Sequence, residues 1–339
     1  AAGIRDQPRS RGLGDVYKRQ VRADLLDAID ASLRRNTESG NMPFGGKTVL
    51  LVGDLHQLPP VVATAEEERL FQERYDSPFF FSAECFRHIQ LVTKNLSKPF
   101  RQTDDTFIEL LNDIRVGRNL AEAVQVLNEA AGYMRRESLL ILTTVNAKAR
   151  QYNEKQLRCI DQKEWCFEAE LEGDWSERDD QLPAPRSLRL KKDAQVMFVK
   201  NGEEWVNGTI GRVVDLNDEF IEVELLSEPH KGTTVGVKRE SWDRYQYKWN
   251  DKRRTIDIRT IGTYRQLPFI LAWAVTIHKA QGLTLDDVNI DLGRGTFAPG
   301  QAYVALSRCR TMDGISFSRP LEVKDVLCDQ KIVDFYSGA

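Results

Sequence analysis

The segment FILAWAVTIHKAQGLTL (269–285) decides the fold class, because an apolar run of strand length passes through Thr276 and His278 into a glycine-containing turn. It is followed by VNIDLG (288–293), a second short apolar run, and by the apolar helical segment QAYVALSRCR (301–310). Alternation of buried strands and helices is typical of α/β proteins with parallel sheets. In such folds, functional side chains gather where the strands end.

Two segments upstream also predict buried strands. TVLLVGD (48–54) is a continuous apolar run that ends in a Gly-Asp corner. It predicts a buried parallel strand that delivers the polar residues of GDLHQLPPV (53–61) to the edge of a sheet. SLLILTTVN (138–146) predicts another buried strand, which runs into a helix over 147–157. Apolar residues at helical spacing predict further helices, within 21–33, 104–117 and 120–130.

A segment with a β-rich sequence pattern lies between these α/β segments. Between about 188 and 262 the chain has short β-rich runs, among them TIGRVVDL, FIEVELL and RTIDIRTIG, divided by Gly, Asn and Asp turns. This spacing predicts a small β-barrel inserted into the α/β fold.

Composition sets broad limits on the class of protein. The length of 339 residues suits about two domains with cores of their own. Five scattered cysteines without a C-x-x-C pair indicate neither a disulfide framework nor a zinc site, so we expect a reducing, cytoplasmic setting. We expect no membrane partner, because no apolar run is long enough to span a bilayer. The net charge of −3 gives no global attraction for nucleic acid, so such binding would need a local groove.

The first twenty residues, AAGIRDQPRSRGLGDVYKRQ, are rich in Arg and Gly and have no hydrophobic period. We interpret 1–20 as an assembly artefact, with a disordered arm as the alternative.

Two polar residues in the first half of the chain suit phosphate chemistry. Gln57 follows the predicted strand and precedes Pro59-Pro60, and a glutamine so placed can hydrogen-bond both a phosphate oxygen and an attacking water. The alternative is a rigid turn with a surface amide. Arg101 lies before a predicted helix, in a loop restrained by Pro99, and its planar fork matches phosphate oxygens. The alternative is a solvated salt bridge.

Two segments in the second half carry similar chemistry. In AVTIHKAQGLTL (274–285), a hydroxyl, a ring N–H, an ammonium and an amide suit the phosphates of a nucleic-acid backbone, and Gly282 permits close approach. A histidine metal site is the rival interpretation. Arg308, at the far end of 301–310, suits an arginine finger, whereas the simpler interpretation is a basic residue that complements a helix dipole.

The string GGKT (45–48) looks like the end of a phosphate-binding loop. The loop pattern requires glycine at the position of Asn41, and here GKT precedes the predicted strand instead of following it. We therefore do not interpret GGKT as an ATP site.

Six segments strongly resemble, in order and spacing, successive motifs of Pif-type and RecD-like superfamily one DNA helicases of bacterial or phage type: GDLHQLPPV, KPFRQTDDTFIELLNDIRVG, LTTVNAKARQYNEKQL, WVNGTIGRVV, LAWAVTIHKAQGLTL and PGQAYVALSRCR. The resemblance covers about 21–335. It implies RecA-like parallel sheets of a P-loop NTPase helicase core. It also implies a first-lobe remnant with connecting helices at 21–134, a second lobe at 135–339, and a small Src-homology-type barrel at 190–262.

The resemblance implies roles for individual residues. Gln57, with Asp54 nearby, would couple the γ-phosphate of ATP to the DNA site, and Arg101 and Arg308 would contact that phosphate. Two further residues, Gln281 and Gly282, would lie between the nucleotide and the DNA. The residues implied to hold phosphates of single-stranded DNA are Thr144, Asn146, Thr276 and His278.

The chain also departs from the family pattern. The Gly-Lys-Ser/Thr loop and the Asp-Glu pair that precede the helix beginning at about Val21 are not in this sequence. ATP and Mg²⁺ would therefore be held mainly by an upstream region. Because phosphoryl transfer depends on positioning and charge neutralisation, we expect this polypeptide alone not to hydrolyse ATP.

The resemblance implies an ATP-dependent 5′–3′ DNA helicase or single-stranded DNA translocase as the parent protein, with a role in DNA repair and recombination. No stable protein partner is evident. One alternative is a non-catalytic single-stranded DNA-binding module, which an upstream P-loop would exclude. A protein-interaction domain built on the β-rich segment is another, but it leaves the ordered motifs unexplained.

Overall fold

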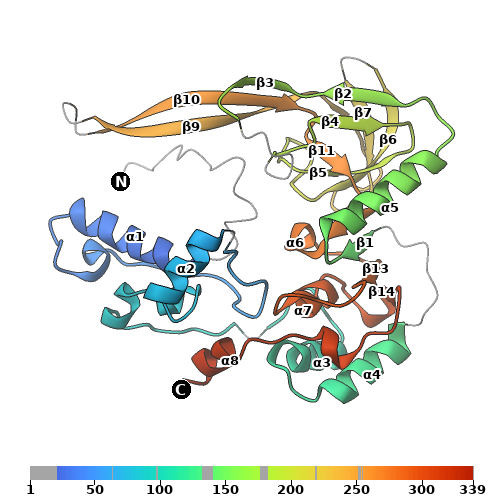
Figure 1. Cartoon of the computed structure of the whole chain (residues 1–339). Helices are drawn as coiled ribbons and strands as arrows, with labels where there is room; N and C mark the ends of the chain where they lie inside the picture. Colours follow the sequence, from blue (N-terminus) through green and yellow to red (C-terminus); the bar gives the residue numbers. More distant parts are fainter. Residues whose placement is uncertain are drawn as a thin grey trace. The chain divides into compact units, whose positions relative to one another are not determined.

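The computed structural model describes residues 21–338 except 63, 97, 132–139, 176–181, 218–219, 251–252 and 254. The proposed artefact at 1–20 lies outside these residues. Packing divides the chain into two compact units. The middle unit falls within Leu139–Ala280, and the terminal unit combines Asp15–Ser138 with Gln281–Ala339 (Figure 1).

The middle unit begins and ends with the two strands of a parallel pair. β1 (Ile141–Thr143) runs beside β12 (Ala274–Thr276), with Thr143 opposite Thr276. Helix α5 (Asn146–Cys159) follows β1, and the short helix α6 (Ile277–Ala280) follows β12. The α/β fold with parallel strands is thus confirmed. β1 is shorter than the predicted strand at 138–146, of which 138–139 lie outside the described residues.

Between these strands the middle unit is almost entirely β-structure, as predicted. Its strands form a five-stranded antiparallel sheet in the order β11-β5-β6-β7-β8, a three-stranded sheet in the order β3-β10-β9, and the pair β2-β4. The strand bounds are β2 Trp165–Glu168, β3 Glu170–Gly173, β4 Ser187–Leu190, β5 Gln195–Phe198, β6 Ile210–Leu216, β7 Ile221–Leu225, β8 Thr234–Val237, β9 Glu240–Asn250, β10 Thr255–Gln266 and β11 Phe269–Leu271. The β-structure therefore starts earlier than the sequence pattern indicated. Closure into a barrel stays a prediction.

Strict alternation along β7 shows why this sequence forms a half-buried sheet. Ile221, Val223 and Leu225 are fully buried, whereas Glu222 and Glu224 between them are partly exposed. Successive side chains of a strand point to opposite faces, so one face of β7 joins the core and the other meets water. Each such buried side chain contributes about 1.5–3 kcal/mol to folding.

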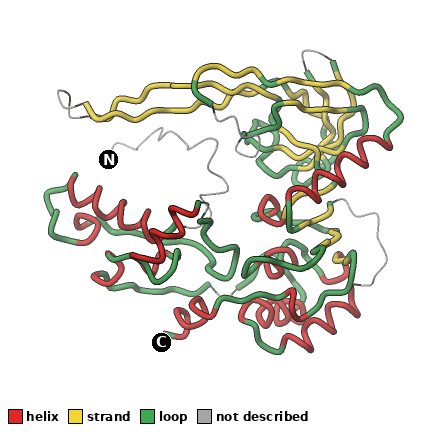
Figure 2. The backbone as a smooth tube through the Cα atoms, in the orientation of Figure 1, coloured by secondary structure: helices red, strands yellow, loops and turns green. Residues whose placement is uncertain are grey.

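The terminal unit contains six of the described α-helices and a second parallel strand pair (Figure 2). β13 (Val288–Asp291) pairs with β14 (Ile315–Phe317), with Val288 opposite Ile315. The helix bounds are α1 Ala23–Arg35, α2 Ala65–Arg74, α3 Asp105–Val116, α4 Leu120–Ala131, α7 Gln301–Leu306 and α8 Gln330–Ser337. Short 3-10 helices occupy Pro43–Gly46, Phe80–Ser82, Cys85–His88, Met312–Gly314 and Val323–Asp325.

Helix α3 illustrates how local sequence fixes an element of this unit. The Asp104 carboxylate accepts hydrogen bonds from the backbone N–H groups of Thr106 and Phe107, which caps the first turn. Gly117 ends the helix in the left-handed conformation, with φ of 74°. The predicted helix starting near Asp104 is therefore confirmed, and its apolar face is buried.

The prediction of a buried strand at 48–54 is wrong for this structure. TVLLVGD forms no strand, and Leu50 is 84% exposed. The run at 91–96 also forms no strand, with Val92 88% exposed. The physical reason is that a parallel strand is buried only when neighbouring strands and helices cover it, and within the described ranges no strand pairs with either run.

Candidate functional site

A tight turn in the terminal unit positions Gln57. The backbone N–H of Gln57 bonds the carbonyl of Asp54 at 3.2 Å, and the Asp54 carboxylate accepts from the His56 backbone at 3.1 Å. The same carboxylate accepts from the Gln57 side-chain amide at 3.1 Å, so the amide has a defined orientation. Asp54 and Gln57, which are close in the sequence, therefore form one hydrogen-bonded corner.

The segment before α7 lies directly against this corner. A Cβ atom on Gly300 would lie 2.5 Å from the backbone oxygen of His56 and 2.6 Å from that of Gln57. Gly300 also has a φ of 76°, so only glycine fits this close approach. On α7, the Tyr303 hydroxyl bonds the Asp54 carboxylate at 3.3 Å. The glycine thus brings the helix with the PGQAYVALSR motif onto the corner that carries Gln57.

Gln281 meets the same corner from another part of the chain. Its side-chain amide donates a 2.7 Å hydrogen bond to the side-chain oxygen of Gln57. Gly282 follows with a φ of 94°, and no heavy atom lies within 4 Å of where its Cβ would be. Gln281 therefore contacts Gln57 directly, and the placement of Gln281 and Gly282 between nucleotide and DNA stays a prediction.

Arg101 and Gln102 attach their loop to the carbonyl end of α7. Arg101 donates to the carbonyl of Ser307 at 3.1 Å and to the Thr284 hydroxyl at 3.0 Å. The buried Gln102 amide donates to the carbonyls of Ser307 and Cys309 at 3.1 and 2.9 Å. Burial lowers the pKa of Arg101 from its ordinary value, but an arginine remains charged at neutral pH.

Arg308 is turned inward. The side chain is 2% exposed, and its guanidinium donates to the carbonyls of Val304 and Leu283 at 2.9 and 3.3 Å and to the Ser307 hydroxyl at 2.8 Å. The C-cap of α7 is Ser307, so Arg308 lies one residue beyond the helix end. Both the helix-dipole interpretation and the phosphate-contact interpretation remain compatible with this position.

These contacts connect the predicted residues of the terminal unit into one cluster. Hydrogen bonds lead from Asp54 to Gln57 and on to Gln281. Two residues further, Leu283 accepts from Arg308, whose neighbour Ser307 accepts from Arg101. The candidate nucleotide-contacting residues are thus gathered and not dispersed.

Sequence reasoning missed two members of this cluster. Tyr303 contacts Asp54, and burial, followed by the Asp54 charge, raises the pKa of its hydroxyl. Gln102 pairs with two carbonyls at the end of α7. Both lie inside the helicase-like motifs, close to more conspicuous arginines, and only the folded contacts reveal them.

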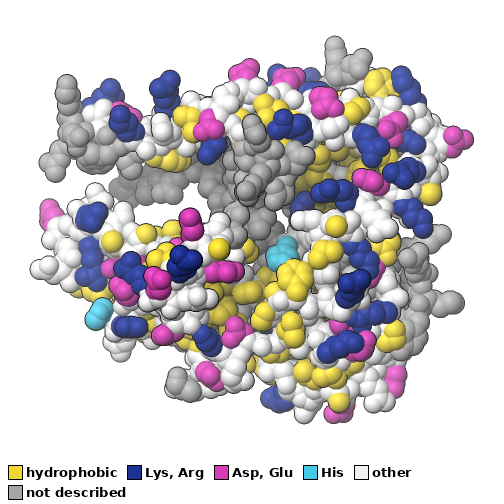
Figure 3. All heavy atoms as spheres, in the orientation of Figure 1, with side chains coloured by type: hydrophobic (Ala, Val, Ile, Leu, Met, Phe, Trp, Pro, Cys, Tyr) yellow, Lys and Arg dark blue, Asp and Glu magenta, His cyan; other side chains and the backbone are white. Residues whose placement is uncertain are grey.

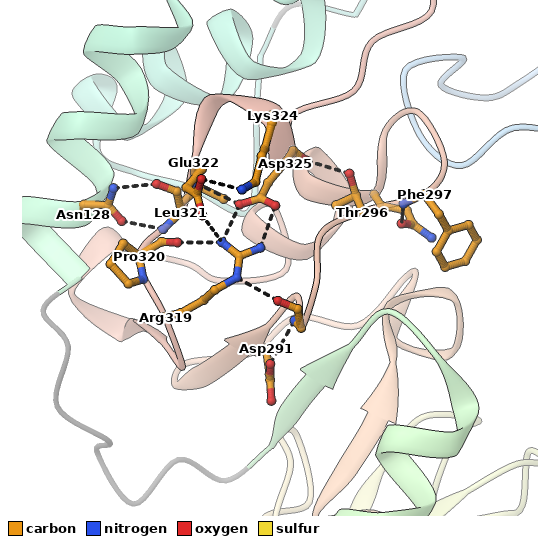
Figure 4. Close-up of polar contacts among 12 residues, drawn as sticks. Asn128, Asp291, Thr296, Phe297, Arg319, Pro320, Leu321, Glu322, Lys324 and Asp325 are labelled. Atoms are coloured by element: carbon orange, nitrogen blue, oxygen red, sulfur yellow. Dashed lines mark hydrogen bonds and ion pairs between the residues drawn. The ribbon is translucent and has the colours of Figure 1, made fainter.

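An ion pair braces the loop that leads into α7 (Figure 4). Arg319 makes two 2.7 Å contacts with the fully buried Asp325 and donates to the carbonyl of Gly293 at 2.8 Å. The Thr296 hydroxyl donates to the Asp325 carbonyl at 2.7 Å. A bidentate pair fixes both position and orientation, so this brace holds 293–296 upstream of Gly300.

The candidate DNA-contacting residues lie in the middle unit at the ends of its parallel strands. Thr276 is the last residue of β12, and Thr144 directly follows β1. Asn146 begins α5 and His278 lies in α6. Because parallel strands end at the same edge of a sheet, all four belong to one edge. The two threonines are buried, Asn146 is exposed and His278 is partly exposed.

A buried amide fixes this edge. Asn153 of α5 donates to the carbonyls of Leu271 and Ala274 at 3.0 and 2.9 Å and accepts from the Ala274 backbone at 2.8 Å. It therefore attaches the helix after β1 to the start of β12.

Among the described residues, no group of three or more His, Cys, Asp or Glu side chains could hold a metal, and no helix is long and apolar enough to cross a bilayer.

Comparisons with known proteins place the chain in a family. The model of the family described as PIF1-like helicase matches residues 19–125. The crystal structure titled Bacteroides Pif1 bound to ssDNA matches with a TM-score of 0.73 at 34% identity, covering 95% of this chain and 74% of that one. The chain belongs to the PIF1-like helicase family. A second Bacteroides Pif1 structure, in complex with ADP-AlF3 and ssDNA, matches with a TM-score of 0.72 at 32% identity, covering 99% and 79%.

Curated members of the PIF1-like family match over most of this chain. The ATP-dependent DNA helicase PIF1 of Rattus norvegicus is 36% identical over 333 residues, covering 94% of this chain and 47% of its own length. The ATP-dependent DNA helicase Pif1 of Bdellovibrio bacteriovorus is 32% identical over 318 residues, covering 91% and 66%. The chain spans about half the length of the first of these PIF1-like relatives and about two thirds of the second.

Proposed function

We propose that this chain is the C-terminal part of an ATP-dependent 5′–3′ DNA helicase that translocates on single-stranded DNA. The terminal unit would sense the γ-phosphate of ATP, and the middle unit would hold the DNA backbone. The observation that carries the proposal is the hydrogen bond between Gln281 and Gln57, because Gln281 directly follows the helix that contains His278. The amide that we propose senses the nucleotide therefore bonds the residue that follows the proposed DNA-contacting helix.

The residues of the terminal-unit cluster fit a triphosphate. Arg101 and Arg308 supply planar cationic donors, which suit phosphate oxygens and neutralise charge that spreads over the transferring group. Gln57 supplies an uncharged donor and acceptor that can orient a water molecule for in-line attack. ATP supplies the phosphoryl group and its free energy of transfer when bound. Arg308 would have to exchange at least one of its bonds to the chain for a phosphate oxygen.

Mg²⁺ fits this chain less well than the phosphates do. Mg²⁺ is usually held by one or two carboxylates together with substrate phosphates. In the cluster, Asp54 is already engaged by the Gln57 amide and the Tyr303 hydroxyl. We therefore assign most of the Mg²⁺ and ATP binding to a part of the protein upstream of Val21.

The four middle-unit residues suit single-stranded DNA because hydroxyl, amide and ring N–H groups hydrogen-bond phosphates without reading the sequence. Thr276 and Thr144 would donate from the strand ends, and Asn146 and His278 from the first turns of the following helices.

The five unpaired cysteines support the cytoplasmic setting. Participation in DNA repair and recombination is part of the same proposal.

Steady-state ATP turnover, with and without single-stranded DNA, tests the proposal in two proteins. The full-length protein that contains this chain should hydrolyse ATP and be stimulated by DNA, and Arg308→Ala should abolish turnover while largely keeping nucleotide affinity. The 339-residue chain alone should show no turnover. Gln125→Ala, which removes an exposed amide on α4, is the matched control and should leave the kinetics unchanged.

Two outcomes would overturn parts of this proposal. Turnover by the isolated chain at ordinary motor rates would contradict the assignment of the ATP cradle to an upstream region. A full-length protein that binds single-stranded DNA without any ATP turnover would favour the non-catalytic DNA-binding module.

A further inference from the structure

The segment 319–327, which we call the strap, holds both ends of the loop that joins β13 to α7. Near the start of this loop, the carbonyl of Gly293 accepts a 2.8 Å hydrogen bond from Nε of Arg319. At its end, the backbone N–H of Gly300 donates to the carbonyl of Leu327 at 3.0 Å. The strap therefore fixes the position at which α7 begins.

The middle of the loop is held by the same segment (Figure 4). The Thr296 hydroxyl donates to the backbone carbonyl of Asp325 at 2.7 Å. A Cβ atom on Gly295 would lie 3.2 Å from the Asp325 carboxylate, so the loop passes close to this side chain. The strap is attached in turn to α4, where the Asn128 side chain exchanges two hydrogen bonds with the backbone of Leu321, at 2.9 and 2.8 Å. The loop before α7 is thus connected through the strap to a second helix of the terminal unit.

One ion pair gives the strap a fixed shape. Arg319 contacts both carboxylate oxygens of Asp325 at 2.7 Å, and the backbone N–H of Glu322 donates to the same carboxylate at 2.9 Å. Figure 3 shows basic and acidic side chains scattered over the surface, where water hydrates them, whereas Asp325 is fully buried. Burial alone would raise the pKa of Asp325, but its bonds to Arg319 and Glu322 hold that pKa below its ordinary value. The pair is therefore charged at neutral pH.

A bidentate ion pair does more than hold two segments together. Apolar side chains of similar size often stabilise a fold as well as a buried ion pair does, so stability alone does not explain the pair. Two parallel N–H···O bonds instead fix an orientation. Orientation matters at Gly300, where a Cβ atom would lie 2.5 Å from the backbone oxygen of His56 and 2.6 Å from that of Gln57. A small displacement of the loop would therefore change how α7 meets the corner that carries Gln57.

We propose that Arg319 and Asp325 are positioning residues for ATP turnover, which orient α7 so that Arg308 and Gln57 meet the same phosphate. Neither member of the ion pair touches the nucleotide, because both act through Gly300 and the helix that follows it. The inference rests on the proposed function, which supplies the contacts of Arg308 and Gln57 with ATP. A displacement of about 1 Å in a reacting group can cost on the order of a hundredfold in rate. Loss of the pair should therefore lower kcat.

Steady-state ATP turnover of the full-length protein that contains this chain, at saturating single-stranded DNA, tests the proposal. Arg319→Gln should lower kcat about ten- to a hundredfold and keep KM for ATP within about twofold, because we assign most of the ATP binding to an upstream region. Arg319→Lys keeps the charge but not the bidentate geometry, so its kcat should lie between the two. Lys324→Gln is the matched control and should leave the kinetics unchanged, because it removes a cation of the same strap whose ion pair with Glu322 is exposed to water.

Amide hydrogen exchange separates positioning from a general loss of stability. In Arg319→Gln, the amides of 293–301 and 54–57 should exchange at least about tenfold faster than in the unmodified protein, whereas those of α1 should keep their rates. A merely structural role would instead lower protection throughout the terminal unit, because global unfolding exposes all its amides together. Circular dichroism checks that each variant is folded at the assay temperature. If Arg319→Gln does not fold, Arg319→Lys replaces it in both measurements, with a smaller expected loss of kcat.

The outcomes separate this inference from the proposed function. If the unmodified full-length protein does not turn over ATP, the proposed function fails and this inference fails with it. If it turns over ATP but the Arg319 variant keeps its kcat, or loses protection throughout the terminal unit, the positioning role alone is overturned. A raised KM at unchanged kcat would also overturn that role, because it would assign Arg319 to nucleotide binding. The expected result is a lower kcat at constant KM, together with faster exchange confined to the loop and the corner.

Discussion

The side-chain amide of Gln281 donates a 2.7 Å hydrogen bond to the side-chain oxygen of Gln57, which lies 224 residues away in the sequence. Gln57 is fixed on its other side by Asp54 at 3.1 Å. This hydrogen bond matters for function only if the effects of the two glutamines on ATP turnover are energetically coupled. We therefore propose to measure that coupling energy.

We expect Gln57→Ala and Gln281→Ala each to lower DNA-stimulated ATP turnover of the full-length protein. In the double variant the losses should not add, with a coupling energy of about 0.5–1.5 kcal/mol, which is typical of one hydrogen bond. Steady-state kinetics on the four proteins of the cycle give this number. Gln125→Ala combined with Gln57→Ala is the control cycle, and strict additivity in both cycles would show that the contact has no role in coupling.

Gln102 is expected to stabilise the fold as well as the site. Its amide satisfies the carbonyls of Ser307 and Cys309 at the end of α7. Gln102→Leu keeps the size of the side chain but leaves these acceptors with fewer partners, so it should lower the free energy of unfolding by about 1–3 kcal/mol. Urea denaturation followed by circular dichroism measures the loss. Gln125→Leu, at an exposed position, should change stability by less than about 0.5 kcal/mol.

The segments whose sequence carries its own start and stop signals were predictable. Helix α3 has Asp104 as its N-cap and Gly117 at its end, and both are visible in the sequence. β12 combines an apolar run with a polar turn, and the structure places it as expected. The contact between Gln57 and Gln281 was not predictable from local sequence, because no local pattern can relate residues so far apart.

Other features depend on tertiary contacts that a sequence does not display. The strand predicted at 48–54 has the right composition, but its burial depends on which strands lie beside it. Gln102 and Tyr303 are ordinary polar residues until their partners are known. The inward position of Arg308 depends on the carbonyls of Val304 and Leu283, which any sequence would supply.

The cysteines provide a direct test of the described packing. Burial, with a contribution from Asp27, raises the pKa of Cys85 to about 12, and burial raises the pKa of Cys309 to about 11. Cys159 and Cys166 are exposed. Since only the thiolate reacts, iodoacetamide at about pH 8 should modify the exposed pair at least about a hundredfold faster than the buried pair. Mass spectrometry of native protein gives the rates, and equal rates after denaturation in urea serve as the control.

His56 should make the stability of the terminal unit depend on pH. Desolvation, with the nearby charge of Arg115, lowers the pKa of His56, while Asp54 partly opposes the shift. The unfolded chain therefore takes up this proton at a higher pH than the folded one, so stability falls as the pH drops below about 6.5. Urea unfolding between about pH 5 and 8 measures this slope.

The imidazole of His56 also stacks on Tyr336, with ring centroids 5.0 Å apart. His56→Phe keeps an aromatic ring there but cannot titrate, and its unfolding free energy should change less over the same pH range. A variant with the same slope as the unmodified chain would assign the dependence to other groups.

The exposed apolar runs at 48–52 and 91–96 give the sharpest contrast between the sequence pattern and the structure. Leu50 and Val92 are 84% and 88% exposed and belong to apolar segments that pair with no strand, and such segments are prone to associate with other chains. We expect Leu50→Lys/Val92→Lys to reduce self-association, measured by light scattering, and to change the free energy of unfolding by less than about 0.5 kcal/mol. Leu26→Lys, at a buried position of α1, should by contrast cost several kcal/mol, on the order of the penalty for burying an unpaired charge. A large loss of stability from the double lysine variant would contradict the exposed positions of Leu50 and Val92.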